Sequence, residues 1–322
     1  MVGASHHIRG VLAAVGLTAL AGGCTTGLST VHLTGSLEKT SLVVAAVPAA
    51  DSAGLYVAQQ QGFFAAAGLN VKIATVVSSA TAISGQLNGQ YDITSGNYVS
   101  YILAAAQQHA DLRFIAEGSI MQPHAQEIVT AAGSPITTIT QLRGKTIGVN
   151  VPDNIGTLLV GTALEENGVP ASSAHLKPIP FPEMAAALQN HEVDAAWLPE
   201  PFISSAEQQI GAQQLFDVDQ GATANFPIAG YVATNTWLQK YPRTAAAFTA
   251  ALEKGQALAD SSRADDQVGM QTFAGISQQT AAIMAFPNYP LGVDRVRLQR
   301  VADAMQRFGL LTQPFNVRQM VG

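Results

Sequence analysis

Strand-length apolar runs alternate with helix-length segments through most of the chain, and this alternation restricts the fold to a few classes. An apolar run at residues 41–48 is followed by apolar residues at helical spacing over 55–67, and Gly68 then ends that predicted helix. Val71 and Ile73 next alternate with polar neighbours, as in a half-buried strand. A strand, a helix and a strand in this order form a βαβ unit, which implies parallel strands.

The same alternation continues to about residue 240. Strands are predicted at 71–77, 91–94, 112–118, 127–131, 146–149, 175–181, 193–199 and 213–218, and helices at 78–90, 97–109, 140–142, 155–167, 182–192, 200–210 and largely from 243 to the end. This pattern predicts an α/β protein with two doubly wound, mostly parallel sheets. We expect lobe I to comprise residues 41–125 and 230–322 and lobe II residues 126–229, with two crossing segments near 125 and 230.

The first residues are typical of a secretory signal. Residues 1–23 combine a short segment made slightly basic by Arg9 with an apolar stretch shorter than the roughly 20 residues that span a membrane. The segment resembles a bacterial lipoprotein signal that ends at Cys24, the single cysteine of the chain, although Ala21 stands where a large aliphatic residue is usual. We therefore expect an extracytoplasmic protein that is lipid-anchored to the membrane through Cys24, with a polar tether at 24–40. A plain signal peptide with an unmodified cysteine is the alternative.

Composition excludes some partners. Charged residues make up 12% of the chain, about half of the usual share of roughly 25%, and the net charge is −6. Nucleic-acid binding calls for clustered Lys and Arg, which this sequence does not have. We expect a monomer that binds no nucleic acid.

Familiar catalytic and metal motifs are incomplete. The "GKT" at residues 144–146 has Ile139 where a phosphate-binding loop needs glycine, and "HEVDA" at 191–195 lacks the second histidine of a zinc-protease motif. No Gly-x-Ser-x-Gly nucleophile motif is present. Neither a catalytic residue nor a metal or cofactor site is predicted.

Small polar residues instead gather where predicted strands give way to helices. In open α/β sheets, ligands bind outside the carboxyl ends of the strands, where helix N-termini offer free N–H groups. The candidates are Asp51, Ser52, Ser78, Ser79, Thr81, Ser95, Asn97, Tyr98, Asn150, Asp153, Asn154, Thr157, Trp197 and Glu200. Each of these loops could also be an ordinary helix cap, since Ser, Thr, Asp and Asn are preferred there. Five such loops at one rim favour a ligand site.

Several segments resemble the solute-binding proteins of bacterial ABC importers, in the branch that includes nitrate-, alkanesulfonate-, taurine- and thiamine-pyrimidine-binding proteins. The matching segments are "GLYVAQQQGFFAAAGLNVKI", "LNGQYDITSGN", "LRGKTIGV", "LQNHEVDAAWLPEPF" and "GYVATNTWL". The resemblance implies a two-lobed, type II periplasmic-binding-protein fold that closes on a small molecule and docks on an ABC permease with its ATPase.

The resemblance also assigns roles to residues. Ser79 and Thr81 match positions that hold the ligand's anionic group in sulfonate and nitrate binders, and Glu200 matches an acidic family position. Glu200 could equally be a helix-start carboxylate, and Trp197 a core aromatic rather than a stacking partner. Asp51 replaces a neutral amide or aromatic residue, which argues against a purely anionic ligand.

Two other functions stay open. Related folds serve in fungal thiamine-pyrimidine synthesis and in menaquinone biosynthesis, but the cysteine-rich metal motif of the fungal synthases is missing here. A sensory or other non-transport lipoprotein with the same fold is the second alternative, and a permease and an ATPase encoded alongside this chain would decide against it.

Overall fold

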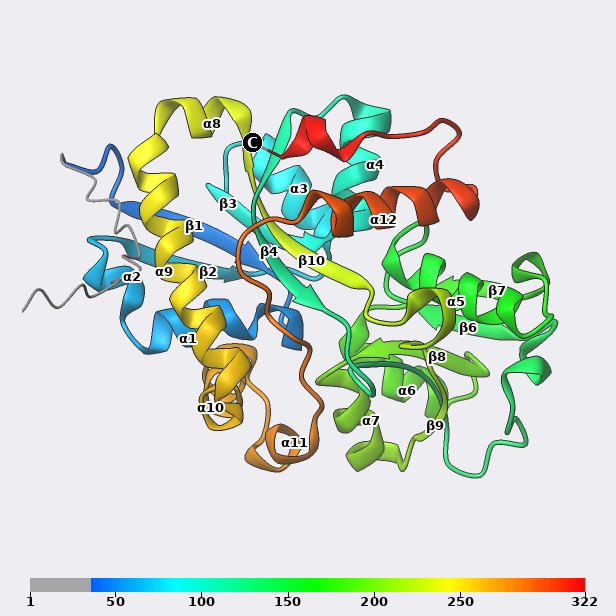
Figure 1. Ribbon diagram of the computed structural model, residues 1–322. Coiled ribbons are helices and arrows are strands. Elements are labelled where there is room, and N and C mark those ends of the chain that lie inside the picture. Colours follow the sequence, from blue (N-terminus) through cyan, green and yellow to red (C-terminus); the bar gives the residue numbers. More distant parts are fainter. Residues whose placement is uncertain (1–35, 322) are drawn as a thin grey trace, which may run out of the picture. The chain divides into compact units, whose positions relative to one another are not determined.

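The computed structural model describes residues 36–321, so the predicted signal sequence and Cys24 lie outside the described part. The described chain forms two sheets of five strands each, with helices packed against them (Figure 1). The α/β prediction with two mostly parallel sheets is therefore confirmed.

The first sheet has the strand order β2-β1-β3-β10-β4. Its strands are β1 (Ser41–Ala46), β2 (Asn70–Thr75), β3 (Ile93–Asn97), β4 (Leu112–Ile120) and β10 (Pro227–Thr234). β1 pairs in parallel with β2 and β3, whereas β10 lies antiparallel to both of its neighbours. The inner strands β3 and β10 are almost entirely buried, although β3 contains Thr94, Ser95 and Asn97.

The second sheet repeats this plan with the order β7-β6-β8-β5-β9. Its strands are β5 (Gln126–Thr130), β6 (Thr146–Val149), β7 (His175–Pro178), β8 (Ala195–Pro199) and β9 (Gln213–Asp217). Here β5 is the antiparallel strand, between β8 and β9. The chain therefore passes from one sheet to the other between β4 and β5 and returns between β9 and β10. The lobe boundaries near 125 and 230 stay a prediction.

Twelve α-helices connect and cover the strands of the described chain. They are α1 (Ala53–Gln60), α2 (Phe63–Ala66), α3 (Ser79–Leu87), α4 (Tyr98–Gln108), α5 (Ile155–Glu166), α6 (Met184–Gln189), α7 (Phe202–Ile210), α8 (Asn235–Lys240), α9 (Pro242–Ser261), α10 (Arg263–Ala274), α11 (Gln278–Ile283) and α12 (Arg295–Arg307). The long helix α9 runs against α1, and Phe248 of α9 stacks on Phe64 of α2 with ring centroids 5.1 Å apart (Figure 1). None of the helices in residues 36–321 is long and apolar enough to cross a membrane.

Several predicted boundaries are wrong, including the following three. The helix predicted at 55–67 is divided into α1 and α2, because Gly62 adopts a φ of +71° that a helix cannot contain. β3 does not end at Thr94 but continues to Asn97, since Ser95–Asn97 pair with β10. The end of the chain is also not helical beyond Arg307, apart from a short 3-10 helix at Val317–Met320.

Candidate ligand-binding pocket

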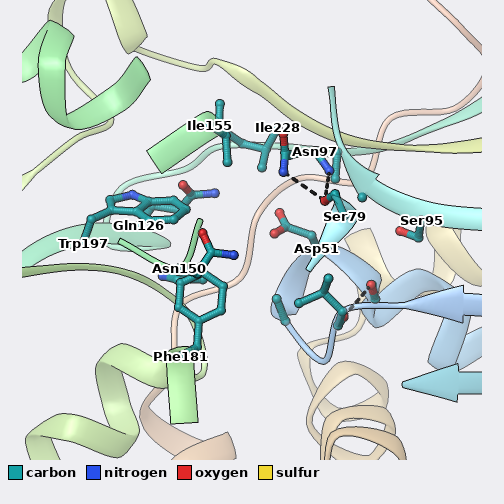
Figure 2. Close-up of a pocket in the computed structure, with 16 residues that line it drawn as sticks. Asp51, Ser79, Ser95, Asn97, Gln126, Asn150, Ile155, Phe181, Trp197 and Ile228 are labelled. Atoms are coloured by element: carbon teal, nitrogen blue, oxygen red, sulfur yellow. Dashed lines mark hydrogen bonds between the residues drawn. The ribbon is translucent and has the colours of Figure 1, made fainter. Parts of the chain in front are cut away.

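A small pocket lies at the rim where parallel strands of both sheets end (Figure 2). The first sheet and the loops after it contribute Val47, Ala49, Asp51, Ser52, Ser79, Ser95, Gly96, Asn97, Ile228 and Ala229, and the second sheet and its loops contribute Gln126, Asn150, Ile155, Phe181, Trp197 and Pro199. The cavity volume is about 40 Å³. Because roughly 10–15 Å³ suffices for one water molecule, this cavity is larger than a site for a single water.

Ser79 points a hydroxyl donor at the pocket because of how α4 is capped. Asn97 is the N-cap of α4, and its Oδ1 accepts the backbone N–H of Ser100 at 2.9 Å, which fixes the amide orientation. The amide nitrogen Nδ2 and the backbone N–H of Asn97 then both donate to Ser79 Oγ, at 2.9 and 3.0 Å. With its acceptor capacity used, the Ser79 hydroxyl is left to donate.

Asn150 is oriented by the same arrangement at the start of α5. Asn154 is the N-cap of α5, where its Oδ1 accepts the N–H of Gly156 at 3.0 Å. Its amide nitrogen therefore donates to Asn150 Oδ1 at 2.8 Å. This leaves Asn150 Nδ2 as a donor at the pocket wall. The loops of each sheet thus supply a hydrogen-bond donor that a helix cap holds in place.

Asp51 is the charged side chain among the residues that line the pocket. It lies in a one-turn 3-10 helix, Ala50–Ser52, directly before α1. Its Oδ1 accepts a hydrogen bond from Ser119 Oγ of β4 at 2.5 Å. Burial raises the pKa of the Asp51 carboxyl to about 6, while the Ser119 hydrogen bond acts in the opposite direction.

The second sheet and its loops supply the apolar wall and two polar atoms without partners. Trp197 is 2% exposed and lies 5.6 Å, centroid to centroid, from Phe181. Its ring also packs against the α5 backbone at Gly156, where a Cβ would come within 2.5 Å of the ring. Trp197 Nε1 and Gln126 Oε1 are buried and have no hydrogen-bond partner in the described structure. Buried polar atoms are normally paired, so a ligand in this pocket would satisfy them.

The structure brings half of the predicted site residues to the pocket and leaves the others outside it. The residues that line it are Asp51, Ser52, Ser79, Ser95, Asn97, Asn150 and Trp197. Those that do not are Ser78, Thr81, Tyr98, Asp153, Asn154, Thr157 and Glu200. A ligand-binding role for any of them stays a prediction.

Local packing explains most of the residues left outside. Ser78 is the N-cap of α3 and accepts the N–H of Thr81 at 3.2 Å, and the Thr81 side chain is exposed. Tyr98 is fully buried and turned towards Phe114, with ring centroids 5.1 Å apart. Asp153 is exposed at a positive φ of 51°. These positions follow a strand end, but their side chains are committed to capping, core packing or solvent.

Two more of the predicted residues, Asn154 and Thr157, lie at the start of α5. Asn154 caps this helix and reaches the pocket through Asn150, as described above. Thr157 lies in the first turn of α5 and is 8% exposed, and its Oγ1 has no hydrogen-bond partner in the described structure.

Glu200 links distant parts of the chain. Its carboxylate accepts hydrogen bonds from the backbone N–H and the hydroxyl of Ser204 in α7, at 3.1 and 2.7 Å, and from Ala285 N, at 3.2 Å. Its backbone carbonyl accepts the N–H of Ala50, beside Asp51, at 2.9 Å. Burial raises the pKa of Glu200 to about 7, and these carboxylate hydrogen bonds act against that rise. Glu200, just after β8 of the second sheet, therefore contacts the turn before α1 and the segment after α11, beside the pocket.

Sequence reasoning missed nine lining residues, which are Val47, Ala49, Gly96, Gln126, Ile155, Phe181, Pro199, Ile228 and Ala229. Gln126 opens β5 and Ile228 lies near the start of β10, the two antiparallel strands. The start of an antiparallel strand lies at the rim where its parallel neighbours end, as the pairing of Gln126 with Pro199 shows. Knowing which strands run antiparallel would have pointed to both residues. Within residues 36–321, no group of three or more His, Cys, Asp or Glu side chains is placed to hold a metal ion.

Solved structures with the same fold include both binding proteins and an enzyme. The alkanesulfonate-binding protein SsuA from Xanthomonas axonopodis pv. citri, bound to MOPS, is 16% identical with a TM-score of 0.75, covering 89% of this chain and 99% of that chain. The periplasmic nitrate-binding protein NrtA from Synechocystis PCC 6803 is 14% identical with a TM-score of 0.73, covering 89% and 85%. The desulfurization enzyme DSZB is 15% identical with a TM-score of 0.66, covering 88% and 96%.

At these identities the likeness establishes a periplasmic-binding-protein fold. No curated protein matches the chain. A family model described as NMT1/THI5 like matches residues 49–262, which is most of the described chain and includes the residues that line the pocket from Ala49 to Ala229. The chain belongs to the NMT1/THI5-like family.

Proposed function

We propose that this chain is the extracytoplasmic solute-binding protein of an ABC importer. It captures a small organic solute or anion, in the range of sulfonates, nitrate, taurine and pyrimidines, and delivers it as a monomer to a permease with its ATPase. The observation that carries the proposal is the pocket, which residues of both lobes line. Each lobe supplies one hydrogen-bond donor to it, Ser79 or Asn150, and a helix-capping asparagine orients that donor. Small-molecule sites combine apolar walls with a few such converging polar groups.

An enzymatic function has less support. A desulfurization enzyme shares the fold, but Asp51 is the sole titratable side chain in the lining of this pocket. Acid–base or nucleophilic catalysis usually pairs two such groups within hydrogen-bond reach. A sensory protein with the same pocket would bind its solute equally well, and a neighbouring permease and ATPase gene pair would distinguish transport from sensing.

Ligand binding should raise the melting temperature and close the two lobes. A ligand that binds the folded state alone adds about 2.7 kcal/mol at 100 times its dissociation constant, which is roughly 5–10 °C for a chain of this size. A thermal-shift screen over sulfonates, nitrate, taurine, pyrimidines, flavins and amines should identify such a solute. X-ray scattering with that solute should then give a smaller radius of gyration, since the segments between β4 and β5 and between β9 and β10 act as hinges.

Two variants make this experiment specific to the pocket. Asn150→Ala should reduce the thermal shift, because it removes a lining donor. Thr81→Ala should keep the shift, because the Thr81 side chain is exposed and outside the pocket. The proposal fails if none of these solutes alters the melting temperature, or if a bound solute leaves the radius of gyration unchanged.

We further propose that Cys24 is lipidated and anchors the protein to the outer side of the cytoplasmic membrane. Support comes from the "LAGGC" sequence behind a short apolar stretch. Cells fed a labelled fatty acid should label the wild type but not Cys24→Ala, and the variant should become soluble or stay uncleaved. Equal membrane retention of both proteins without any lipid label would contradict the anchor.

A further inference from the structure

The residues that line the pocket include a negatively charged side chain but no positively charged one. Asp51 contributes a carboxylate, and neither Lys nor Arg is among the lining residues. Ser119 Oγ donates to Asp51 Oδ1, and the backbone N–H of Asp51 is a second donor to the carboxylate. The charge of Asp51 acts on the Tyr231 and Tyr289 hydroxyls, but burial raises the pKa of both, so they stay neutral. No positive charge offsets Asp51 in the lining.

We propose that the solute carries a protonated amine or an amidine-like N–H group that donates to Asp51, and that solutes with only negative charge are rejected. This inference rests on the proposed solute-binding function and narrows its substrate class. It sets this chain apart from a binder of simple oxyanions, for which the Asp51 carboxylate would be a like charge inside the site.

The charge state of Asp51 at neutral pH agrees with this assignment. Burial raises the pKa of its carboxyl to about 6, so the group is mostly ionised at pH 7.5. A second anion in the same small cavity would meet a like charge with little water to screen it. A cation or an N–H donor would instead form a charge-assisted hydrogen bond with the carboxylate.

The remaining polar atoms indicate what else the solute carries. Figure 2 shows Asp51 and Ser79 on one side of the pocket, with Gln126, Asn150 and Trp197 across from them. Gln126 Oε1 is an acceptor without a partner, and Ser79, Asn150 and Trp197 present donors. The pocket therefore fits a solute with N–H donors and at least one acceptor, rather than a group that only accepts.

Matched pairs of probes test the inference at pH 7.5. Acetamidinium and acetate have the same shape and opposite charges, and taurine differs from ethanesulfonate by one ammonium group. In calorimetry the N–H-bearing member of each pair should bind wild-type protein at least tenfold more tightly. Asp51→Asn should reduce that preference by roughly 10- to 100-fold, the usual effect of losing a hydrogen bond to a charged group.

A buried carboxyl outside the pocket supplies the control. Asp266→Asn makes the same chemical change, Asp to Asn, but Asp266 does not line the pocket, so this variant should leave the preference intact. Tighter binding of acetate and ethanesulfonate to the wild type, or an unchanged preference in Asp51→Asn, would overturn the inference and leave solute binding standing. Failure of the whole solute screen together with all four probes would instead overturn the proposed function. Because the wild-type comparison needs no variant, the test holds even if Asp51→Asn folds poorly.

Discussion

The free energy of unfolding should fall by several kcal/mol when the pH is raised from 5 to 8. The reason lies in three carboxyls, of which Asp51 is half-buried and Glu200 and Asp266 are buried. Burial raises their pKa values to about 6 for Asp51, about 7 for Glu200 and about 8 for Asp266. Each of these groups holds its proton more tightly in the folded state than in the unfolded state. Such a group contributes stability fully below its unfolded pKa and loses it as the pH rises through the folded pKa.

The size of the effect follows from the shifts. One pKa unit corresponds to about 1.4 kcal/mol, so Glu200, moving from 4.5 to about 7, accounts for roughly 3 kcal/mol over the full window. The raised pKa of His124 acts in the same direction, since its charged form is favoured by Glu127. The lowered pKa values of Glu38 and Asp294 act only at more acidic pH, outside this window. Urea unfolding at pH 5, 6.5 and 8 would measure the slope.

Asp266→Asn isolates one contribution to this slope. Asp266 is 1% exposed, its Oδ1 has no hydrogen-bond partner in the described structure, and the charges of Asp265 and Asp260 raise its pKa further, with Arg263 opposing them. An uncharged amide at this position should raise stability at pH 8 and flatten the dependence on pH. Stability that is constant or increasing between pH 5 and 8 would contradict the assignment of these protonation states.

Elements with local signals could be predicted from the sequence, and elements fixed by distant partners could not. β6 was predicted at its observed bounds because an apolar run between Lys145 and Asn150 needs no other information. The end of β3 was missed because Ser95–Asn97 read as a loop, and their partner strand β10 lies far along the chain. The antiparallel direction of β5 and β10 could not be predicted either, since a sequence pattern does not encode strand direction.

The candidate site shows the same division at the level of side chains. The sequence could place polar residues at the rim, and Asp51, Ser79, Asn97 and Asn150 do line the pocket. The sequence could not show which way each side chain points. Ser78, which caps α3, and Ser79, which lines the pocket, are adjacent serines that the sequence does not distinguish. The hydrogen bonds of the caps decide this, and they depend on the folded helix start.

Gly255→Leu should destabilise the protein by about 3 kcal/mol and weaken solute binding as well. Gly255 of α9 lies against α1, where a Cβ would come within 2.4 Å of Gly54 O and 2.5 Å of Ala58 Cβ. Because one of these contacts is with backbone, the clash cannot be relieved by a rotamer change, and the helices have to separate. Leucine gains about 1 kcal/mol in helix propensity over glycine, which is too little to offset this overpacking.

The loss of binding follows from where α1 begins. Ala53 is its first residue, and the turn that carries Asp51 directly precedes it, so a displaced α1 moves the carboxylate in the pocket. Ala257→Leu is the matched control, because it adds a side chain of the same type to the exposed face of the same helix. Denaturant unfolding and calorimetry on both variants should show losses for Gly255→Leu alone. Equal stability of the two variants would mean that α1 and α9 can part without cost, and normal affinity in a destabilised Gly255→Leu would mean that Asp51 is positioned by Ser119 rather than by α1.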